Sequence, residues 1–352
     1  MALSYTEAAD IAKHLIYFYV KTGALSQTTQ DKPLMRELRK GQKTFPGGWK
    51  KISTPVQGAF MVDNVSGFFA GYSQLDTLTF GQAINALRAE ETWYEIHAGL
   101  EISGTEMKAD GISLVDDRGG TREHASAAEV RITTSMFKNR IEDFGESWAR
   151  AFQKMLWSDG STDAKAPAGI RSILTDTPAV GTTHGISRAT YSWWRHRALV
   201  GASAITPSAA GQTLTKALRS EVRQLRRYGG KPSLLLAGST FIEALELEVH
   251  EKGVYTQEGF ANEGKTDIGM AKISMRGVGT FEYDPTMDDI GWAKRCIIVD
   301  PRRLKLWVMD GEDTKTVHPT RPYDANVYLE SLFWTGGVMA NQLNCHGLYE
   351  TT

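Results

Sequence analysis

The sequence predicts an α+β fold, in which helices and mainly antiparallel strands occupy different stretches of the chain. Three observations support this fold class: a long amphipathic helix near residues 128–157, a helix–strand–helix unit over residues 211–251, and a series of short strands beyond Ile273. Runs of strands that follow runs of helices are typical of α+β proteins. The C-terminal third is therefore expected to be mainly antiparallel.

The predicted long helix depends on apolar residues that recur at helical spacing. Ser126–Glu129 has the pattern of a capping box at its start, and Asp159-Gly160 is a typical end. A continuous helix over this stretch spans about 45 Å at ~1.5 Å per residue, which is long for a globular domain. The apolar stripe consists of Phe137, Ile141, Phe144, Trp148, Phe152 and Met155.

The composition is that of a folded protein with one large domain or two ordinary ones, because 41% of the 352 residues are hydrophobic and 23% are charged. The 40 Lys and Arg nearly balance the 41 Asp and Glu, so no global basic field points to nucleic-acid recognition.

The apolar run Leu15–Val20 is far shorter than the ~20 residues of a membrane span, and no membrane partner is expected. Cys296 and Cys345 favour two buried thiols in a reducing compartment over a single disulfide.

Gly and Pro are dense in residues 22–57, which predicts an extended arm without regular structure of any length. An amphipathic helix is expected before the arm, because apolar residues between positions 8 and 19 fall on one helical face. The second half of the arm has a net charge of +5, which indicates either a DNA-binding arm or, as we favour, a solvated or partner-facing strip. These charges are Arg36, Arg39, Lys40, Lys43, Lys50 and Lys51 against Glu37.

Residues 94–102 alternate between apolar and polar side chains, which is the period of a half-buried strand. Together with an extended segment near residues 75–80, this strand is expected to form the two arms of a β-excursion. Residues 88–123 have a net charge of −5, opposite in sign to the charge of the arm.

The segment Gly259–Thr266 matches the phosphate-binding pattern of two glycines followed by Lys and Thr. Such a loop needs a buried strand before it and a helix after it, so that backbone N–H groups converge on the phosphates. The upstream residues are charged and the downstream residues have the alternation of a strand, which favours a flexible surface loop over a P-loop NTPase. The eight histidines are scattered, and no catalytic residue, cofactor or metal site is predicted.

The segment Tyr191–Arg197 mixes aromatic side chains with Arg, as single-stranded nucleic-acid grooves and protein interfaces both do. Without a basic groove, the cluster favours core packing or an interface. The aromatic candidates for contacts between copies of the chain, with one neighbouring cation, are Trp93, Tyr94, Trp193, Trp194 and Arg195.

Five features follow one another along the chain. They are an extended arm, a β-excursion that ends at Leu100–Glu106, a long helix that ends at Trp157–Gly160, the pair Gly169-Ile170 and the motif Tyr191–Arg195. In this order they resemble the major capsid proteins of tailed bacteriophages, which have the Hong Kong ninety-seven fold. The resemblance runs from about residue 58 to the C-terminus. The chain departs from the family pattern at residues 113–121, which are extra sequence between the β-excursion and the long helix.

The resemblance implies a shell-building protein without catalytic activity, found in the virion capsid and, during assembly, in the host cytoplasm. It also implies a division of the chain into structural regions. These are an N-arm with its N-terminal helix (1–57), the start of a peripheral domain (58–65), an E-loop (66–103), the peripheral domain with its spine helix (104–164), an axial domain (165–275), and return strands of both domains (276–352).

The partners that the resemblance implies are copies of the same chain, which form the pentamers and hexamers of an icosahedral head. The resemblance also implies a scaffolding protein, a portal and a cement protein as partners. Packaged double-stranded DNA is a further implied partner, which the chain would contact without sequence preference. No long coiled-coil extension is present, so a separate scaffolding protein, or none, is implied. A nanocompartment or gene-transfer-particle shell would share the fold, whereas the P-loop NTPase would not.

Opposite charges on the arm and on the E-loop region predict contacts between neighbouring subunits. Exposed pairs contribute about 0–1 kcal/mol each, so such contacts gain strength from repetition over the shell. The rival interpretation is that the basic strip faces DNA. The predicted pairs join Arg36, Arg39, Lys40 and Lys43 of one subunit to Glu90, Glu91 and Glu95 of another.

Overall fold

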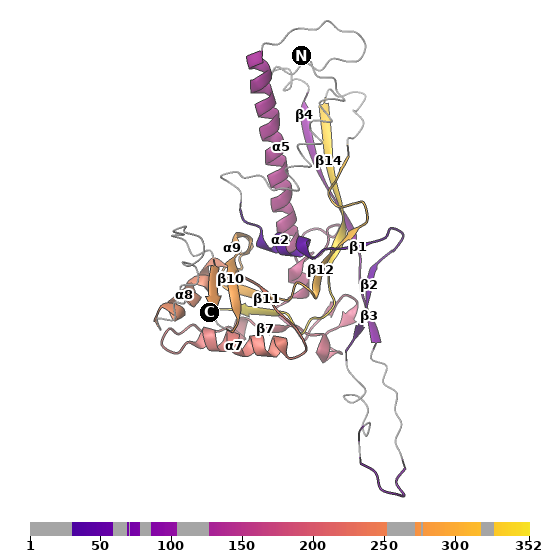
Figure 1. The fold of residues 1–352 in the computed structure, drawn as a ribbon, viewed down its shortest axis with the longest axis vertical. Coiled ribbons are helices and arrows are strands. Elements are labelled where there is room, and N and C mark those ends of the chain that lie inside the picture. The colour runs from indigo at the N-terminus through magenta and orange to yellow at the C-terminus, as the bar shows by residue number, and fades with distance from the viewer. Residues whose placement is uncertain are drawn as a thin grey trace.

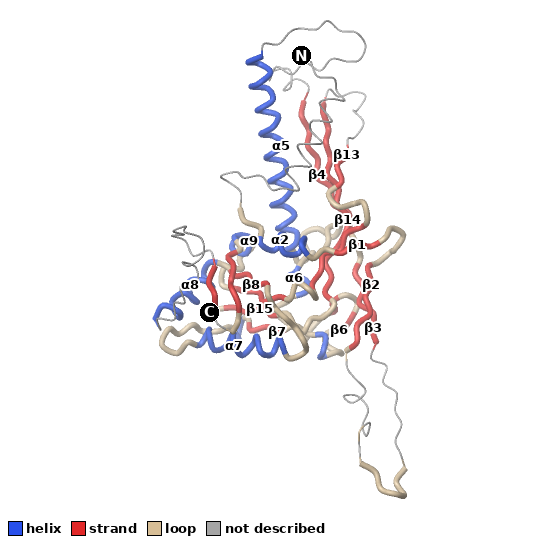
Figure 2. Tube along the Cα trace, in the orientation of Figure 1, coloured by secondary structure: helices blue, strands red, loops and turns tan. Residues whose placement is uncertain are grey.

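The computed structural model describes residues 30–58, 69, 71–77, 86–103, 127–251, 272–275, 277–317 and 327–352. Helices and two larger sheets form the body of the molecule. One long helix extends from it, and residues 71–77 lie far from it on the opposite side (Figures 1 and 2). This arrangement confirms the predicted α+β fold class. The expected N-terminal helix, residues 113–121 and the segment Gly259–Thr266 lie outside the described residues.

Helix α5 (Ala127–Leu156) confirms the predicted long helix and is 30 residues long. Its C-terminal half buries Ile141, Trp148 and Phe152 in the larger of two hydrophobic cores. The Phe152 ring meets the Trp334 ring edge to face, with 5.1 Å between the centroids. These side chains fix the C-terminal half of the helix to the body, and Figure 1 shows α5 beside the sheet of β4 and β14.

The sheet beside α5 has five strands and is organised around the long strand β14. On one side β14 pairs antiparallel with β4 over ten positions, from Val327 opposite Ser103 to Gly336 opposite Tyr94. On its other side it pairs antiparallel with β12 and β13, and β1 joins β12 in parallel. The bounds are β1 (Lys43–Phe45), β4 (Tyr94–Ser103), β12 (Leu304–Met309), β13 (Lys315–Val317) and β14 (Val327–Ala340).

The second sheet has six strands and a core of its own, covered by helices α7 (Thr213–Arg226) and α8 (Ser239–Glu251). These helices flank β8, whose four residues are all buried, so the predicted helix–strand–helix unit is confirmed. Cys296 and Cys345 are both buried and free, as expected. In order across the sheet, the strands are β7 (Arg197–Leu199), β15 (Gly347–Glu350), β11 (Arg295–Val299), β8 (Leu234–Ala237), β10 (Gly279–Tyr283) and β9 (Lys272–Met275).

The expectation that the arm has no regular structure is wrong for its second half. Residues Pro33–Lys40 form helix α2, in which Pro occupies the first turn, where its missing N–H costs nothing. Leu34 and Leu38, one helical turn apart, are fully buried in the larger core. Burial of this short apolar stripe outweighs the breakers around it, and β1 and β2 (Ile52–Gln57) follow.

Strand β4 is not an arm of the excursion, contrary to the prediction. Its residues alternate in exposure as expected, yet it pairs with β14 along its whole length. The excursion instead begins and ends in the antiparallel pair of β2 and β3 (Ala86–Glu91). Alternation of apolar and polar residues indicates that one face of a strand is buried, but it does not identify the neighbouring strand.

The strands of the C-terminal third are mainly antiparallel, as predicted. The exceptions are the parallel pairs of β10 with β8, β15 with β7 and β1 with β12. No helix within the described ranges is long and apolar enough to cross a membrane. The remaining short elements are α6 (Ile170–Ile173), β5 (Thr182–Thr183), β6 (Ile186–Ser187), η1 (Ser192–Trp194), η2 (Gly201–Ser203) and α9 (Pro285–Asp289).

Candidate functional site

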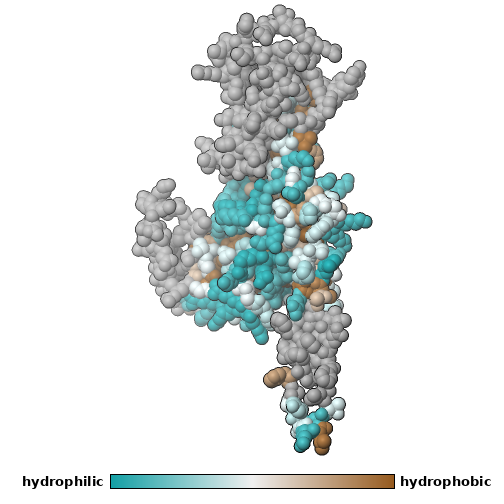
Figure 3. Space-filling model, turned by 45° about the vertical axis from the view of Figure 1, so that its right-hand side comes forward, coloured by the Kyte–Doolittle hydropathy of each residue, from teal (hydrophilic) through white to brown (hydrophobic). Residues whose placement is uncertain are grey.

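The far end of the excursion presents apolar side chains to solvent. Phe69 is 94% exposed, Leu75 is 96% exposed and Tyr72 is 73% exposed. The backbone around them forms a local turn, in which Ser73 N–H donates to Asp76 Oδ2 at 2.6 Å. Figure 1 places residues 71–77 at the far end of the projection, and Figure 3 shows hydrophobic surface there. We call Phe69, Tyr72 and Leu75 the apolar tip.

The base of the excursion is fixed to the body through His184, which lies between β5 and β6. Its Nδ1 is 2.6 Å from Glu91 Oε2. Its Nε2 accepts from the Ala340 backbone N–H at 3.1 Å, which places the ring proton on Nδ1, toward Glu91. The Glu90 backbone N–H donates to the His184 carbonyl at 2.9 Å. These bonds join β3 to the end of β14, so the projection has a rigid root.

The acidic contact candidates have unequal roles in the subunit. Glu91 is already engaged by His184, and Glu90 Oε2 lies 3.3 Å from Nζ of Lys51, which directly precedes strand β2. Glu95 is exposed on the outward face of β4. Only Glu95 therefore matches the expected free carboxylate, and its contact with another subunit stays a prediction.

The basic contact candidates are largely used within the subunit. Arg36 pairs with Glu282 and, at 3.2 Å, with Asp31. Lys40 pairs with Glu37 at 2.6 Å. Lys43 lies over the Trp307 ring, with Nζ 5.3 Å from its centroid. The sequence shows these charges as a strip, whereas the fold neutralises or covers most of them.

Arg39 is buried deeply enough that desolvation lowers its pKa. Its guanidinium carbon lies 5.1 Å from the centroid of the Phe152 ring of α5. Its Nη2 donates to Thr314 Oγ1 at 3.3 Å. Arg39 therefore attaches α2 to the body, which does not fit its prediction as an inter-subunit cation.

The aromatic candidates divide between core and surface. Trp194 is buried and donates through Nε1 to the Thr183 carbonyl at 3.1 Å. Trp93 donates to the Trp49 carbonyl at 2.7 Å, and Tyr94, half-buried, begins β4. Arg195 donates to the carbonyls of residues 188 and 189 at 2.6 and 2.9 Å. Trp194 therefore packs in the core, one of the two expected alternatives, while Arg195 is half-buried and its contact with another subunit stays a prediction.

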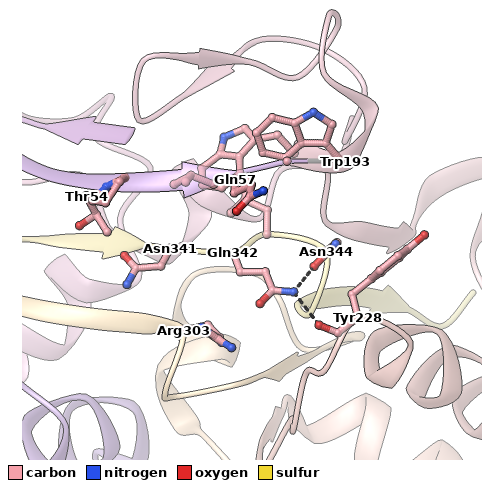
Figure 4. Close-up of a pocket in the computed structure, with 13 residues that line it drawn as sticks. Thr54, Gln57, Trp193, Tyr228, Arg303, Asn341, Gln342 and Asn344 are labelled. Carbon is pink, nitrogen blue, oxygen red and sulfur yellow. Dashed lines mark hydrogen bonds between the residues drawn. The ribbon is translucent and has the colours of Figure 1, made fainter. Parts of the chain in front are cut away.

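Trp193 instead covers the backbone at the start of the excursion. A Cβ added to Gly58 would lie 1.9 Å from Trp193 Cε2, so only glycine fits under this ring. The indole thereby lines a pocket of about 570 Å³ between β2, the η1 turn and the end of β14. Figure 4 shows side chains from all three directions converging there.

The pocket is rich in amide groups and contains Arg303 as its single charged residue. Gln342 Nε2 donates to the Tyr228 carbonyl at 3.2 Å and to Asn344 Oδ1 at 2.7 Å (Figure 4). Asn341 Oδ1 is buried without a hydrogen-bond partner among the described residues. Amides and indoles suit hydrogen bonding and packing rather than acid–base chemistry, which needs paired titratable groups.

Sequence reasoning missed the residues that the fold leaves most available. The apolar tip was hidden in a segment read only as extended chain, although three large apolar residues in a polar, Gly-containing stretch are a usable signal. The amides of the pocket come from separate segments and give no local pattern. Within the described ranges, no group of three or more His, Cys, Asp or Glu is placed to hold a metal ion.

No family model matches the chain, and no curated protein matches it. Several solved structures, however, are similar to this chain in fold. The capsid asymmetric unit of cyanophage A-1(L) superposes with a TM-score of 0.63 at 14% identity, covering 93% of this chain and 94% of that chain. The capsid of an empty GTA particle gives 0.57 at 13%, covering 94% and 93%. The capsid of Myoviridae phage XM1 gives 0.54 at 12%, covering 94% and 95%.

These similarities extend over nearly the whole length of the chains compared. Because the sequence identities are low, the superpositions show a shared fold and nothing more specific. The arrangement agrees with the resemblance inferred from the motifs in its long helix beside one sheet and in its second sheet with its own helices. The chain has the Hong Kong ninety-seven fold of tailed-phage major capsid proteins.

Proposed function

We propose that this chain is a capsid shell protein that assembles into the pentamers and hexamers of an icosahedral phage head enclosing double-stranded DNA. The observation that carries the proposal is the apolar tip, which is almost fully exposed at the end of a projection. Large apolar side chains gain about 1.5–3 kcal/mol each on burial, so a tip held in water indicates a missing partner surface.

The partner surface is a second copy of the same chain. The strands at the base of the excursion pack on their own subunit, with Ile52 and Ala89 in the larger core, whereas the tip stays exposed. Repeated head-to-tail contacts between identical subunits close into rings, and rings close into shells. Residues 71–77 lie far from the body in Figure 1, so the tip is available to a neighbouring subunit.

The structural regions follow from this proposal with one change. We propose residues 58–85 as the E-loop, with β2 and β3 as its base, and place β4 in the peripheral domain with α5. The axial domain comprises the six-stranded sheet with α7 and α8. A scaffolding protein, a portal and a cement protein are further proposed partners, which act on the assembled rings.

Replacing the tip by Phe69→Ser and Leu75→Ser is expected to raise the protein concentration needed for shell assembly by at least about tenfold. The loss of two buried apolar side chains exceeds the ~1.4 kcal/mol that corresponds to a factor of ten. Sedimentation velocity and electron microscopy over a concentration series measure the effect. The fold should be intact by circular dichroism, because neither side chain packs on its own subunit.

The matched control replaces Val180 and Leu247 by serine, since these are 62% and 67% exposed on other surfaces. Assembly of this control should equal that of the wild type. Equal impairment of both double variants would show that general surface polarity, and not the tip, governs assembly. A wild-type chain that stays monomeric at high concentration with a crowding agent would refute the capsid proposal itself.

A gene-transfer-particle or nanocompartment shell is the second candidate, favoured by the similarity to the capsid of an empty GTA particle. Particles purified from the native source separate the candidates by diameter and content. A phage head contains nuclease-protected DNA of one genome length, a gene-transfer particle contains shorter fragments of cellular DNA, and a nanocompartment contains protein.

The P-loop alternative is tested at Lys265. The nearest described elements are helix α8 before the Gly259–Thr266 segment and strand β9 after it, which is the reverse of the strand, loop and helix order that phosphate binding requires. Lys265→Ala is expected to leave assembly unchanged, and calorimetric titration of the wild type with magnesium and ATP should give no binding. Micromolar ATP binding that disappears in this variant would restore the NTPase.

A further inference from the structure

One face of helix α7 has five exposed cations in a row: Lys216, Arg219, Arg223, Arg226 and Arg227. Spacings of three and four residues place them on one side of the helix, along about 16 Å at ~1.5 Å per residue. We call this set the basic stripe. Figure 1 shows α7 along the outer edge of the six-stranded unit.

Within the described part of the chain, no carboxylate forms an ion pair with the stripe. The single acidic residue of α7, Glu221, is buried on the opposite side, where it accepts from Arg197 Nη2 at 2.9 Å and from the Tyr349 hydroxyl at 3.3 Å. Among the described residues, no stripe cation takes part in an ion pair. This is the reverse of the basic arm, where Arg36 and Lys40 have carboxylate partners.

The stability of the helix does not explain the stripe. Cations near a helix C-terminus are favoured by its dipole, which accounts for Arg226 and Arg227. Lys216 and Arg219 lie outside the last turn of α7, where the dipole does not favour cations. Like charges three and four residues apart also repel, as Arg219 and Arg223 do. The stripe therefore weakens α7 unless an anion lies against it.

The helix is nevertheless held rigidly, which suits a binding surface. Glu248 of α8 is buried at the start of α7 and accepts from the backbone N–H groups of Leu214 and Thr215, each at 2.9 Å. Burial opposes its ionisation, but these bonds hold its pKa below the usual range. The carboxylate of Glu248 thus caps the helix, and Leu218 and Val222 fix its inner face in the core.

We infer that the basic stripe binds the phosphate backbone of double-stranded DNA without sequence preference, and that it, rather than the arm, is the DNA contact of this subunit. This inference rests on the proposed function, which places DNA inside the shell. A duplex presents one negative charge per ~1.7 Å along its axis, so a straight row of cations meets phosphates in any register. Four of the five are arginines, whose guanidinium groups bind phosphate oxygens in pairs.

The test is the triple variant Arg219→Gln, Arg223→Gln and Arg226→Gln, measured with a random-sequence fluorescent duplex over a series of salt concentrations. Each lost phosphate contact lowers the slope of log affinity against log salt by ~0.9. Loss of three contacts should reduce the slope by up to about 3, and reduce affinity about equally for every duplex sequence. The matched control is Lys50→Gln, Lys165→Gln and Lys294→Gln, which removes three exposed cations elsewhere.

Empty shells of the triple variant should assemble normally while DNA-filled particles lose DNA at lower salt than the wild type. The inference is overturned if the control changes the slope equally, if the triple variant binds and retains DNA like the wild type, or if it fails to form shells, because the stripe is then buried between subunits. It is also overturned if poly-L-glutamate competes as well as DNA at equal charge, which assigns the stripe to an acidic protein. A wild type that forms no shells refutes the proposed function instead.

Discussion

Replacing Asp284 by alanine is expected to destabilise the subunit by about 3–5 kcal/mol, the largest effect of a single substitution among those considered. Asp284 is fully buried where α9 begins, between the two sheets. Its Oδ2 accepts from Gln153 Nε2 at 2.8 Å and from Trp157 Nε1 at 3.0 Å. Its Oδ1 accepts from the Thr286 N–H at 2.9 Å. Each donor left unpaired inside the protein costs about 1–3 kcal/mol.

Urea unfolding of unassembled subunits measures this loss. Asp310→Ala is the matched control, because that carboxylate is exposed and its removal should change the free energy of unfolding by no more than about 0.5 kcal/mol. Asp284→Asn keeps one acceptor oxygen and removes the charge, so its loss should be smaller than that of Asp284→Ala. A loss below about 1 kcal/mol for Asp284→Ala would show that the three donors find other partners.

The pH dependence of this site has a definite sign. Burial raises the pKa of Asp284 to about 6, although the hydrogen bond from Thr286 and that from Trp157 favour the ionised form. The native state therefore holds the proton more strongly than the unfolded chain does. The free energy of unfolding contributed by Asp284 falls as the pH rises from about 4 to about 6, and Asp284→Asn abolishes that contribution.

Two buried histidines are expected to give the opposite dependence, with the second-largest effect. Burial lowers the pKa of both His196 and His346 to about 4. The unfolded chain takes up these protons below about pH 6.5, whereas the native state resists them until about pH 4. Acidification through this interval should cost up to about 3 kcal/mol per ring, since one pKa unit corresponds to ~1.4 kcal/mol.

The double variant His196→Gln and His346→Asn tests this in the Asp284→Asn background, which removes the opposing carboxylate. The new amides retain the bonds of the rings, in which His196 Nε2 lies 2.8 Å from the Thr175 carbonyl and His346 Nδ1 accepts from the Asp300 N–H at 3.3 Å. Unfolding free energies at about pH 7 and about pH 4.5 should differ by several kcal/mol with the histidines present, and by much less without them. An equal pH dependence with and without the rings would contradict the prediction.

The sequence by itself determined several helices and strands in which one face is buried, although it missed the short helix α2. The apolar spacing of residues 137–155 predicted α5, and alternation over residues 94–102 predicted β4. The order of such elements, with the motif at Tyr191–Arg195, was enough to indicate the capsid fold. These signals are local, because helical and strand periods record the direction of the core from each residue.

Only the tertiary structure decided what each buried face packs against and which charges remain free. The alternation of residues in β4 is equally compatible with a partner strand at residues 75–80 and with β14. The fold shows that β4 pairs with β14. The cations of the arm and those of α7 look alike in sequence. In the fold, Arg39 is buried over Phe152, while Arg223 is exposed and forms no ion pair with another described residue. Pairing joins residues far apart along the chain, so neither periodicity nor a count of charges contains it.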